Sequence, residues 1–157
     1  SMLDMTGIPD ASMDALFSSH NLEHLQTHEV PRALSEFLRV LRPDGFAVIT
    51  CPDLQAIAER VAQDKLTEVI YRSPAGPITP LDVLYGHGPA LAKGNQYMAH
   101  RTGFTLRTLI SALRQSGFSS AIGTRQPPPA YALWVVATKK PRPEPELRAL
   151  AADHFPC

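Results

Sequence analysis

Cysteine, surplus charge and long apolar runs are what this 157-residue sequence has least of. Its two cysteines, Cys51 and Cys157, argue against a disulfide framework and favour a reducing cytoplasm as the location. Fifteen basic side chains balance fifteen acidic ones, and because phosphate binding needs a clustered basic excess, we expect no nucleic-acid partner. No apolar run approaches the length of a membrane span, so we expect no membrane partner either.

What is present in the first half of the chain is an alternation of strand and helix patterns. The short apolar run of residues 13–18 predicts a strand, and residues 28–41 then show the helical period. The apolar stripe of this helix consists of Val30, Ala33, Leu34, Phe37, Leu38 and Leu41. Pro43-Asp44-Gly45 ends the helix, and the apolar residues 46–51 predict a strand that is covered on both faces. Asp53 can then cap a second amphipathic helix. This β-α-β-α order predicts a parallel sheet.

Residues 66–101 lose this periodicity. They are rich in proline and glycine, but their tyrosines, histidines and aliphatic residues argue against disorder. We therefore predict an irregular, packed cap that is inserted in a domain spanning residues 1–140. Its candidates for a substrate pocket are Tyr85, His87, Tyr97 and His100, since each has a flat apolar body and a polar tip. The alternative is that these side chains only anchor the cap to the edge of the sheet.

Regular patterns return after the cap. Thr105 can cap a helix that ends at Gly117, and strands are predicted over residues 119–124 and 131–138. From Pro141 to the end at residue 157, the sequence predicts a stiff proline-rich spacer followed by a short, loosely held helix.

Two motifs connect these elements with a known family. Leu22-Glu23-His24 follows the first predicted strand, and Arg39-Val40-Leu41 with Pro43 and Gly45 leads into the second. This arrangement resembles the class I S-adenosylmethionine (SAM)-dependent methyltransferases, in particular the type 11-like members, from about residue 4 to residue 139. The resemblance implies an α/β fold with an incomplete Rossmann-like sheet, parallel strands plus one antiparallel strand, and helices on both faces. We expect the order 13–18, 46–51, 131–138, 119–124 across the sheet.

The resemblance also implies SAM as the cofactor, and it extends only to the carboxy-terminal portion of the family fold. The family's glycine-rich cofactor loop has no counterpart among the nine glycines. Gly86-His87-Gly88 is the nearest match, but Pro89 follows it and no strand precedes it. The cofactor-side positions that the resemblance retains are Asp4, Met5, Ser18, Ser19, His20 and Asn21. We therefore expect SAM binding to be weak or absent.

The segment from His20 to His24 permits two chemical interpretations. It fits the inverted zinc-protease pattern His-x-x-Glu-His, but that pattern needs a long helix and a third ligand, and here a strand ends just before His20. We therefore expect no metal site. His20, Glu23 and His24 are instead candidates for acid/base catalysis, because histidine titrates near neutrality. The alternative is that Glu23 and His24 only pack against the start of the next helix.

Two functions follow from these observations. The first is a truncated SAM-dependent methyltransferase-like protein that acts on an unknown small-molecule acceptor and is weakly active or inactive as this chain alone. The second is a non-enzymatic, oligomeric interaction module of the same fold. In either case the strand of residues 13–18 is expected at a sheet edge with open backbone groups, which favours a homodimer through this strand and the neighbouring helix.

Overall fold

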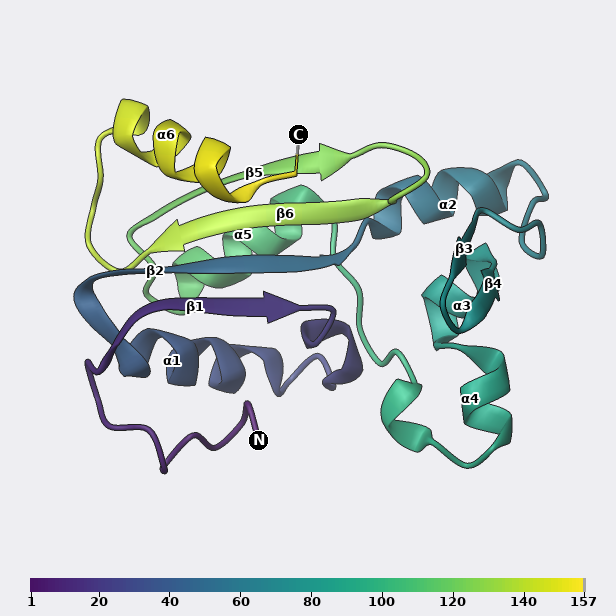
Figure 1. Ribbon diagram of the computed structural model, residues 1–157, viewed down its shortest axis with the longest axis horizontal. Coiled ribbons are helices and arrows are strands. Elements are labelled where there is room, and N and C mark those ends of the chain that lie inside the picture. The colour runs from purple at the N-terminus through teal and green to yellow at the C-terminus, as the bar shows by residue number, and fades with distance from the viewer. Residues whose placement is uncertain (157) are drawn as a thin grey trace.

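The computed structural model describes residues 1–156, and its centre is a four-stranded sheet with helices on both faces (Figure 1). The strands are β1 (Met13–Ser19), β2 (Leu41–Pro52), β5 (Ser120–Gln126) and β6 (Ala132–Thr138), in the order β1-β2-β6-β5. β1 and β2 are parallel, whereas β6 is antiparallel to both β2 and β5. The predicted order, the parallel pair and the single antiparallel strand are confirmed.

The junction between the first helix and β2 differs from the prediction. Helix α1 (Val30–Val40) ends earlier than expected, and Leu41 is already extended, with φ −69° and ψ 136°. Pro43 disfavours helical backbone at Arg42, the residue before it, so the helix cannot continue through this segment. Gly45 instead allows a close approach of strands, since a Cβ there would lie 3.0 Å from the carbonyl oxygen of Asp14 on β1.

Helices α1 and α5 (Leu106–Gln115) cover one face of the sheet (Figure 1). The predicted stripe of α1 points into this core: Ala33 and Leu34 are fully buried and Phe37 nearly so. Leu109 and Leu113 of α5 complete the layer. The predicted cap at Thr105 is confirmed, because its side chain accepts a hydrogen bond from the Thr108 amide.

The opposite face carries α6 (Glu144–His154). Leu147 and Ala151 are buried against Val48 and Val136 of the central strands. The expectation of a loosely held tail is therefore wrong for residues 144–154, because this helix has a small apolar stripe that the sheet covers. The prediction for Cys157 lies outside the described residues.

Beyond the carboxyl ends of β1 and β2 lies the cap (Figure 1). It is less irregular than its sequence suggests, since a hairpin and short helical segments follow α2 (Leu54–Ala62). These segments are β3 (Tyr71–Ser73), β4 (Gly76–Ile78), α3 (Pro80–Tyr85), α4 (Gly88–Ala92) and η2 (Gln96–Met98). Ile57 of α2, Ile78 and Val83 form a small core with Tyr131, which fixes the cap to the end of the sheet.

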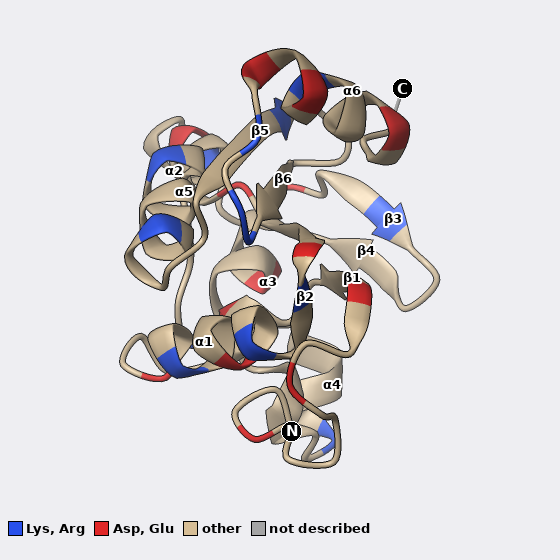
Figure 2. Ribbon diagram, turned by 90° about the vertical axis from the view of Figure 1, so that its left-hand side faces the viewer, with Lys and Arg blue, Asp and Glu red and all other residues tan. Residues whose placement is uncertain are grey.

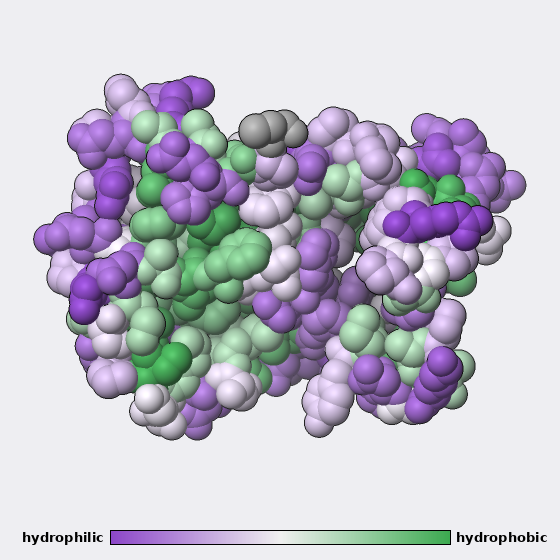
Figure 3. Space-filling view, viewed as in Figure 1, coloured by the Kyte–Doolittle hydropathy of each residue, from purple (hydrophilic) through white to green (hydrophobic). Residues whose placement is uncertain are grey.

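The surface agrees with the balanced composition. Lys, Arg, Asp and Glu are interspersed over α1, α2 and α6 and do not form a one-sign stripe on the side that Figure 2 shows. Apolar side chains gather on the sheet face beside α6 (Figure 3). Phe17 of β1 is 64% exposed there and stacks on Trp134 at 6.1 Å between ring centroids. Across residues 1–156, no helix has both the length and the apolar character that crossing a membrane requires.

Candidate functional site

The site begins where β1 ends. Ser18 is buried and accepts a hydrogen bond from the Asn21 side chain at 3.4 Å. His20 has φ +51°, a backbone conformation that is unfavourable for any residue with a Cβ, and its amide donates to the Thr50 carbonyl on β2 at 2.9 Å. Strained residues of this kind cluster at ligand sites, and in open α/β sheets ligands bind at the carboxyl ends of the strands.

Glu23 is the most unusual side chain of this loop. It lies on the short helix η1 (Leu22–His24), and its carboxylate is only 2% exposed. His20 Nδ1 donates to Oε1 at 3.2 Å, but Oε2 is buried and has no hydrogen-bond partner. The Glu23 carbonyl accepts from the amides of Arg101 and Thr102, at 2.7 and 3.2 Å. The strand loop and the segment returning from the cap are therefore joined at Glu23.

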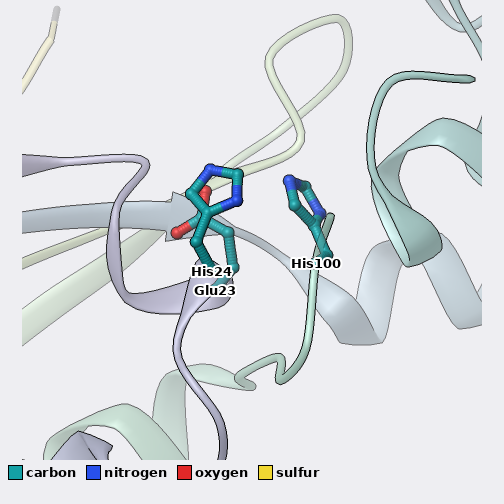
Figure 4. Close-up of side chains that lie close together, drawn as sticks. All are labelled: Glu23, His24 and His100. Carbon is teal, nitrogen blue, oxygen red and sulfur yellow. The ribbon is translucent and has the colours of Figure 1, made fainter. Parts of the chain in front are cut away.

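Two histidines face this carboxylate (Figure 4). His24 Nδ1 donates to the Ala99 carbonyl at 3.1 Å, and His100 Nδ1 donates to the Val83 carbonyl at 2.7 Å. The two rings meet edge to face, with 4.8 Å between their centroids. Burial lowers the pKa of His100, which favours its neutral form. The site therefore combines one buried carboxylate with two oriented imidazoles.

Two adjoining cavities open beside this cluster between the sheet and the cap. One has a volume of about 240 Å³ and reaches Leu54 and Phe104. The other, of about 380 Å³, reaches His20 and His87. Their shared walls are Glu23, Pro52, Val83 and His100, and together we call them the cap cleft. Apolar walls with a few polar groups suit a small organic molecule.

The structure brings together most of the residues that the sequence singled out. His20, Asn21, Glu23 and His24 line the cap cleft, as do Tyr85, His87 and His100. Tyr97 does not, because it lies on η2 and is 90% exposed. Val83 and Arg101 also line the cleft and were missed; no local pattern marks Val83, and Arg101 is recognisable only as the neighbour of His100.

Asp4 and Met5 lie elsewhere. The Met5 amide donates to Glu36 Oε2 at 2.7 Å, and Arg39 Nη2 donates to the Met5 carbonyl at 2.9 Å, so this segment is bound to α1. Neither residue lines the cap cleft. Their predicted grouping with Ser18–Asn21 in one cofactor site therefore stays a prediction.

Comparison with known proteins identifies the fold. Residues 1–49 match the family model of the methyltransferase domain. A solved SAM-dependent methyltransferase of Thermotoga maritima, described as a possible histamine N-methyltransferase, superposes with a TM-score of 0.55 at 14% identity, over 89% of this chain and 61% of that chain. A SAM-dependent methyltransferase of Methanosarcina mazei gives 0.53 at 14% identity, over 88% and 64%. The chain has the class I methyltransferase fold.

A third structure with this methyltransferase fold was solved with ligands. The 1,6-didemethyltoxoflavin-N1-methyltransferase of Burkholderia thailandensis, with bound 1,6-didemethyltoxoflavin and S-adenosylhomocysteine, gives a TM-score of 0.51 at 19% identity. That match covers 82% of this chain and 44% of the other. The chain thus spans less than two thirds of each of these three proteins. No curated protein matches its sequence.

Within this fold, Gly86-His87-Gly88 has a structural role. It joins α3 to α4 and follows no strand. Gly86 has φ +100°, and a Cβ there would lie 2.0 Å from the Met98 carbonyl oxygen. The glycine therefore lets two cap segments touch, an arrangement that the bridge between Gly86 and Ala99 completes.

Proposed function

We propose that this chain is the acceptor-binding portion of a SAM-dependent methyltransferase, and that the cap cleft holds a small-molecule methyl acceptor. The observation that carries the proposal is the position of the cleft: it lies at the carboxyl ends of β1 and β2 in a class I methyltransferase fold, with the Glu23 carboxylate and two imidazoles in its wall.

The proposed chemistry needs little from the protein beyond alignment. Methyl transfer requires the acceptor's nucleophilic atom to lie in line with the sulfonium methyl group, and such positioning contributes much of the rate. His20, Glu23 and His24 are the candidates for removing a proton from an acceptor hydroxyl, thiol or ammonium group. Tyr85, His87 and His100 shape the pocket, which fits an acceptor with a flat, partly polar body.

Cofactor binding by these 157 residues is proposed to be weak. The loop Ser18–Asn21 offers polar groups to SAM, but it contains no glycine. The glycines among residues 1–156 do not form a glycine-rich loop between a strand and a helix that could bind the carboxylate of SAM. Much of the polar surface of SAM would then stay without partners. We expect no binding tighter than about millimolar, roughly −4 kcal/mol, and hence little or no activity from this chain alone.

Protein-observed NMR of the histidine ring signals, recorded with the whole 157-residue protein, tests the proposal. A library of small phenols, amines and carboxylates should contain binders that shift the imidazole signals of His24 and His100 but not those of the exposed His28. Binders that leave His24 and His100 unchanged would contradict an acceptor site in the cap cleft. Calorimetry with S-adenosylhomocysteine tests the cofactor part, and micromolar binding would contradict it.

We also propose that the protein forms a homodimer through β1 and α1. β1 is one of the two outer strands of the described sheet, and its Phe17 and Met13 are 64% and 37% exposed. An open strand edge beside apolar surface favours association with a second copy. A non-enzymatic interaction module would use the same surface, and the acceptor-binding test separates that alternative from the methyltransferase. The cytoplasmic location stays a prediction from the low cysteine content.

A further inference from the structure

Glu23 places a carboxyl group in the protein interior, in the wall of the cap cleft. Its side chain is 2% exposed, and Oε2 is buried without a hydrogen-bond partner. Among residues 1–156, its only ion-pair contact is His20 Nδ1 on the other oxygen, at 3.2 Å, and His20 itself is half exposed. Burying an ionised carboxylate costs several kcal/mol unless a cation compensates for the lost hydration. A cation bound at the free oxygen would provide this compensation.

His24 and His100 offer the complementary donors. One ring nitrogen from each histidine and one Glu23 oxygen all lie within 4.8 Å of one another. Each ring uses Nδ1 to donate to a backbone carbonyl, of Ala99 or Val83, which leaves the lone pair on Nε2. A backbone carbonyl on the other ring nitrogen is the usual outer partner of a metal-binding histidine, because it fixes the tautomer and the ring orientation. Figure 4 shows the three side chains converging from the loop after β1 and from the segment that returns from the cap.

We infer that Glu23, His24 and His100 form a binding site for one divalent transition-metal ion, with Zn²⁺ as the best fit. Two imidazoles and one carboxylate are a donor set that suits zinc and its neighbours in the first transition row. Mg²⁺ and Ca²⁺ prefer sites made wholly of oxygen atoms. Glu23, His24 and His100 all line the cap cleft, so a fourth coordination position would be available to water or to an oxygen or nitrogen of a bound small molecule.

The geometry needs only a small adjustment. Zinc lies about 2.0–2.2 Å from nitrogen and carboxylate ligands, so tetrahedral ligands are roughly 3.4 Å apart. The three ligand atoms lie within 4.8 Å of one another, so bringing them to this separation requires the ends of the side chains to move by about an ångström. His20 acts as a positioning residue, since its hydrogen bond to Oε1 orients the carboxylate with Oε2 free.

This site is not the one that the sequence pattern suggests. The His-x-x-Glu-His pattern would pair His20 with His24 along a long helix, but η1 spans only Leu22–His24 and His20 precedes it at φ +51°. The second imidazole comes instead from His100, far along the chain. We expected no metal site because the His-x-x-Glu-His pattern needs a long helix and a third ligand, and the sequence shows neither. In the fold, His100 from the cap provides a third candidate ligand.

Cobalt binding tests the inference with the metal alone, without acceptor or SAM. The chelator-treated protein should take up one equivalent of Co²⁺, with visible d–d absorption of a four- or five-coordinate site, and Zn²⁺ should displace it. Glu23→Gln and His100→Ala should each weaken binding by more than about 100-fold, beyond the 10–100-fold that loss of an outer partner costs. His20→Ala should fall within that lower range. The matched control is His28→Ala, an exposed histidine four residues from His24, which should bind like the wild type.

Three results would overturn the inference. One is Co²⁺ binding that Glu23→Gln and His100→Ala leave unchanged, and another is equal binding of Mg²⁺. The third is the absence of one-equivalent binding by wild-type protein whose circular dichroism and thermal transition show it to be folded. His24→Gln serves as a second ligand variant if His100→Ala does not fold. Because the test uses neither acceptor nor cofactor, its failure leaves the proposed methyltransferase function untouched, and the reverse also holds.

Discussion

Asp53 offers the sharpest test of how α2 is attached to the sheet. It is the residue between β2 and α2, and its carboxylate is 2% exposed. Oδ1 accepts from the amides of Gln55 and Ala56, at 3.1 and 3.2 Å, and so caps α2. Oδ2 accepts from Arg125 Nε on β5 at 2.5 Å. One side chain therefore stabilises the start of a helix and joins it to the far strand of the sheet.

We expect Asp53→Ala to destabilise the protein by about 2.5 kcal/mol. Loss of the helix cap contributes about 1 kcal/mol. A hydrogen bond between charged groups is worth about 1.5–3 kcal/mol, and we take the lower end because the Arg125 side chain is 38% exposed and regains water. Asp53→Asn retains an oxygen for the cap and loses only the charge, so it should cost less, about 1.5 kcal/mol by the same bookkeeping.

Urea unfolding of the wild type and of both variants measures these differences. By the usual scaling for a protein of this size, Asp53→Ala should also lower Tm by roughly 5–10 °C. Arg125→Ala is the matched variant on the other side of the ion pair and should cost at least as much as Asp53→Asn, because it leaves the buried Asp53 carboxylate without its cation. A loss of unfolding free energy below about 1 kcal/mol for Asp53→Ala would refute the reasoning. Equal losses for the Ala and Asn variants would show that the helix cap and the ion pair do not contribute separately.

Three further predictions concern pH, the cap and assembly. The hydrogen bond from Arg39 lowers the pKa of Glu36 from 4.5 to about 2, so its stabilising contribution is complete above pH 4.5 and disappears as the pH falls towards 2. Glu36→Gln should therefore flatten the stability profile in that range, and an unchanged profile in thermal unfolding would contradict this. Gly86→Ala should destabilise the cap and expose its amides to hydrogen exchange, whereas Gly94→Ala, in open space at a similarly positive φ, should disturb it less. Light scattering at micromolar concentration should show a dimer that Phe17→Lys dissociates, and a wild-type monomer would exclude the proposed interface.

The sequence predicts those features that depend on local pattern. The stripe of α1 marks its buried face because helix periodicity alone fixes which residues share a side. The apolar run 46–51 predicts a central strand, and Asp53 and Thr105 are recognisable as caps from type and position. Local sequence pattern does not predict features that depend on contacts between distant parts of the chain. The burial of α6 depends on a free sheet face, and the Asp53–Arg125 ion pair joins elements that are distant in the chain.

The candidate site was predictable in its parts but not in its assembly. Glu23 and His24 stand out in the motif, and His100 stands out as a histidine in an aromatic-rich segment. Their proximity depends on the path of the cap, which no periodicity describes. The free oxygen of Glu23 is likewise a property of packing, since a glutamate in a predicted loop is normally exposed.

Main-chain hydrogen bonds join the segments that carry the cluster. The Glu23 carbonyl accepts from the amides of Arg101 and Thr102, and the His100 amide donates to the Tyr85 carbonyl at 3.2 Å. His100 is therefore fixed from both sides by backbone groups, independently of the exposed residues around it. Substitutions on the cap surface, such as at Tyr97, leave these bonds intact. We therefore expect substitutions on the surface of the cap to leave the carboxylate and the two imidazoles in position.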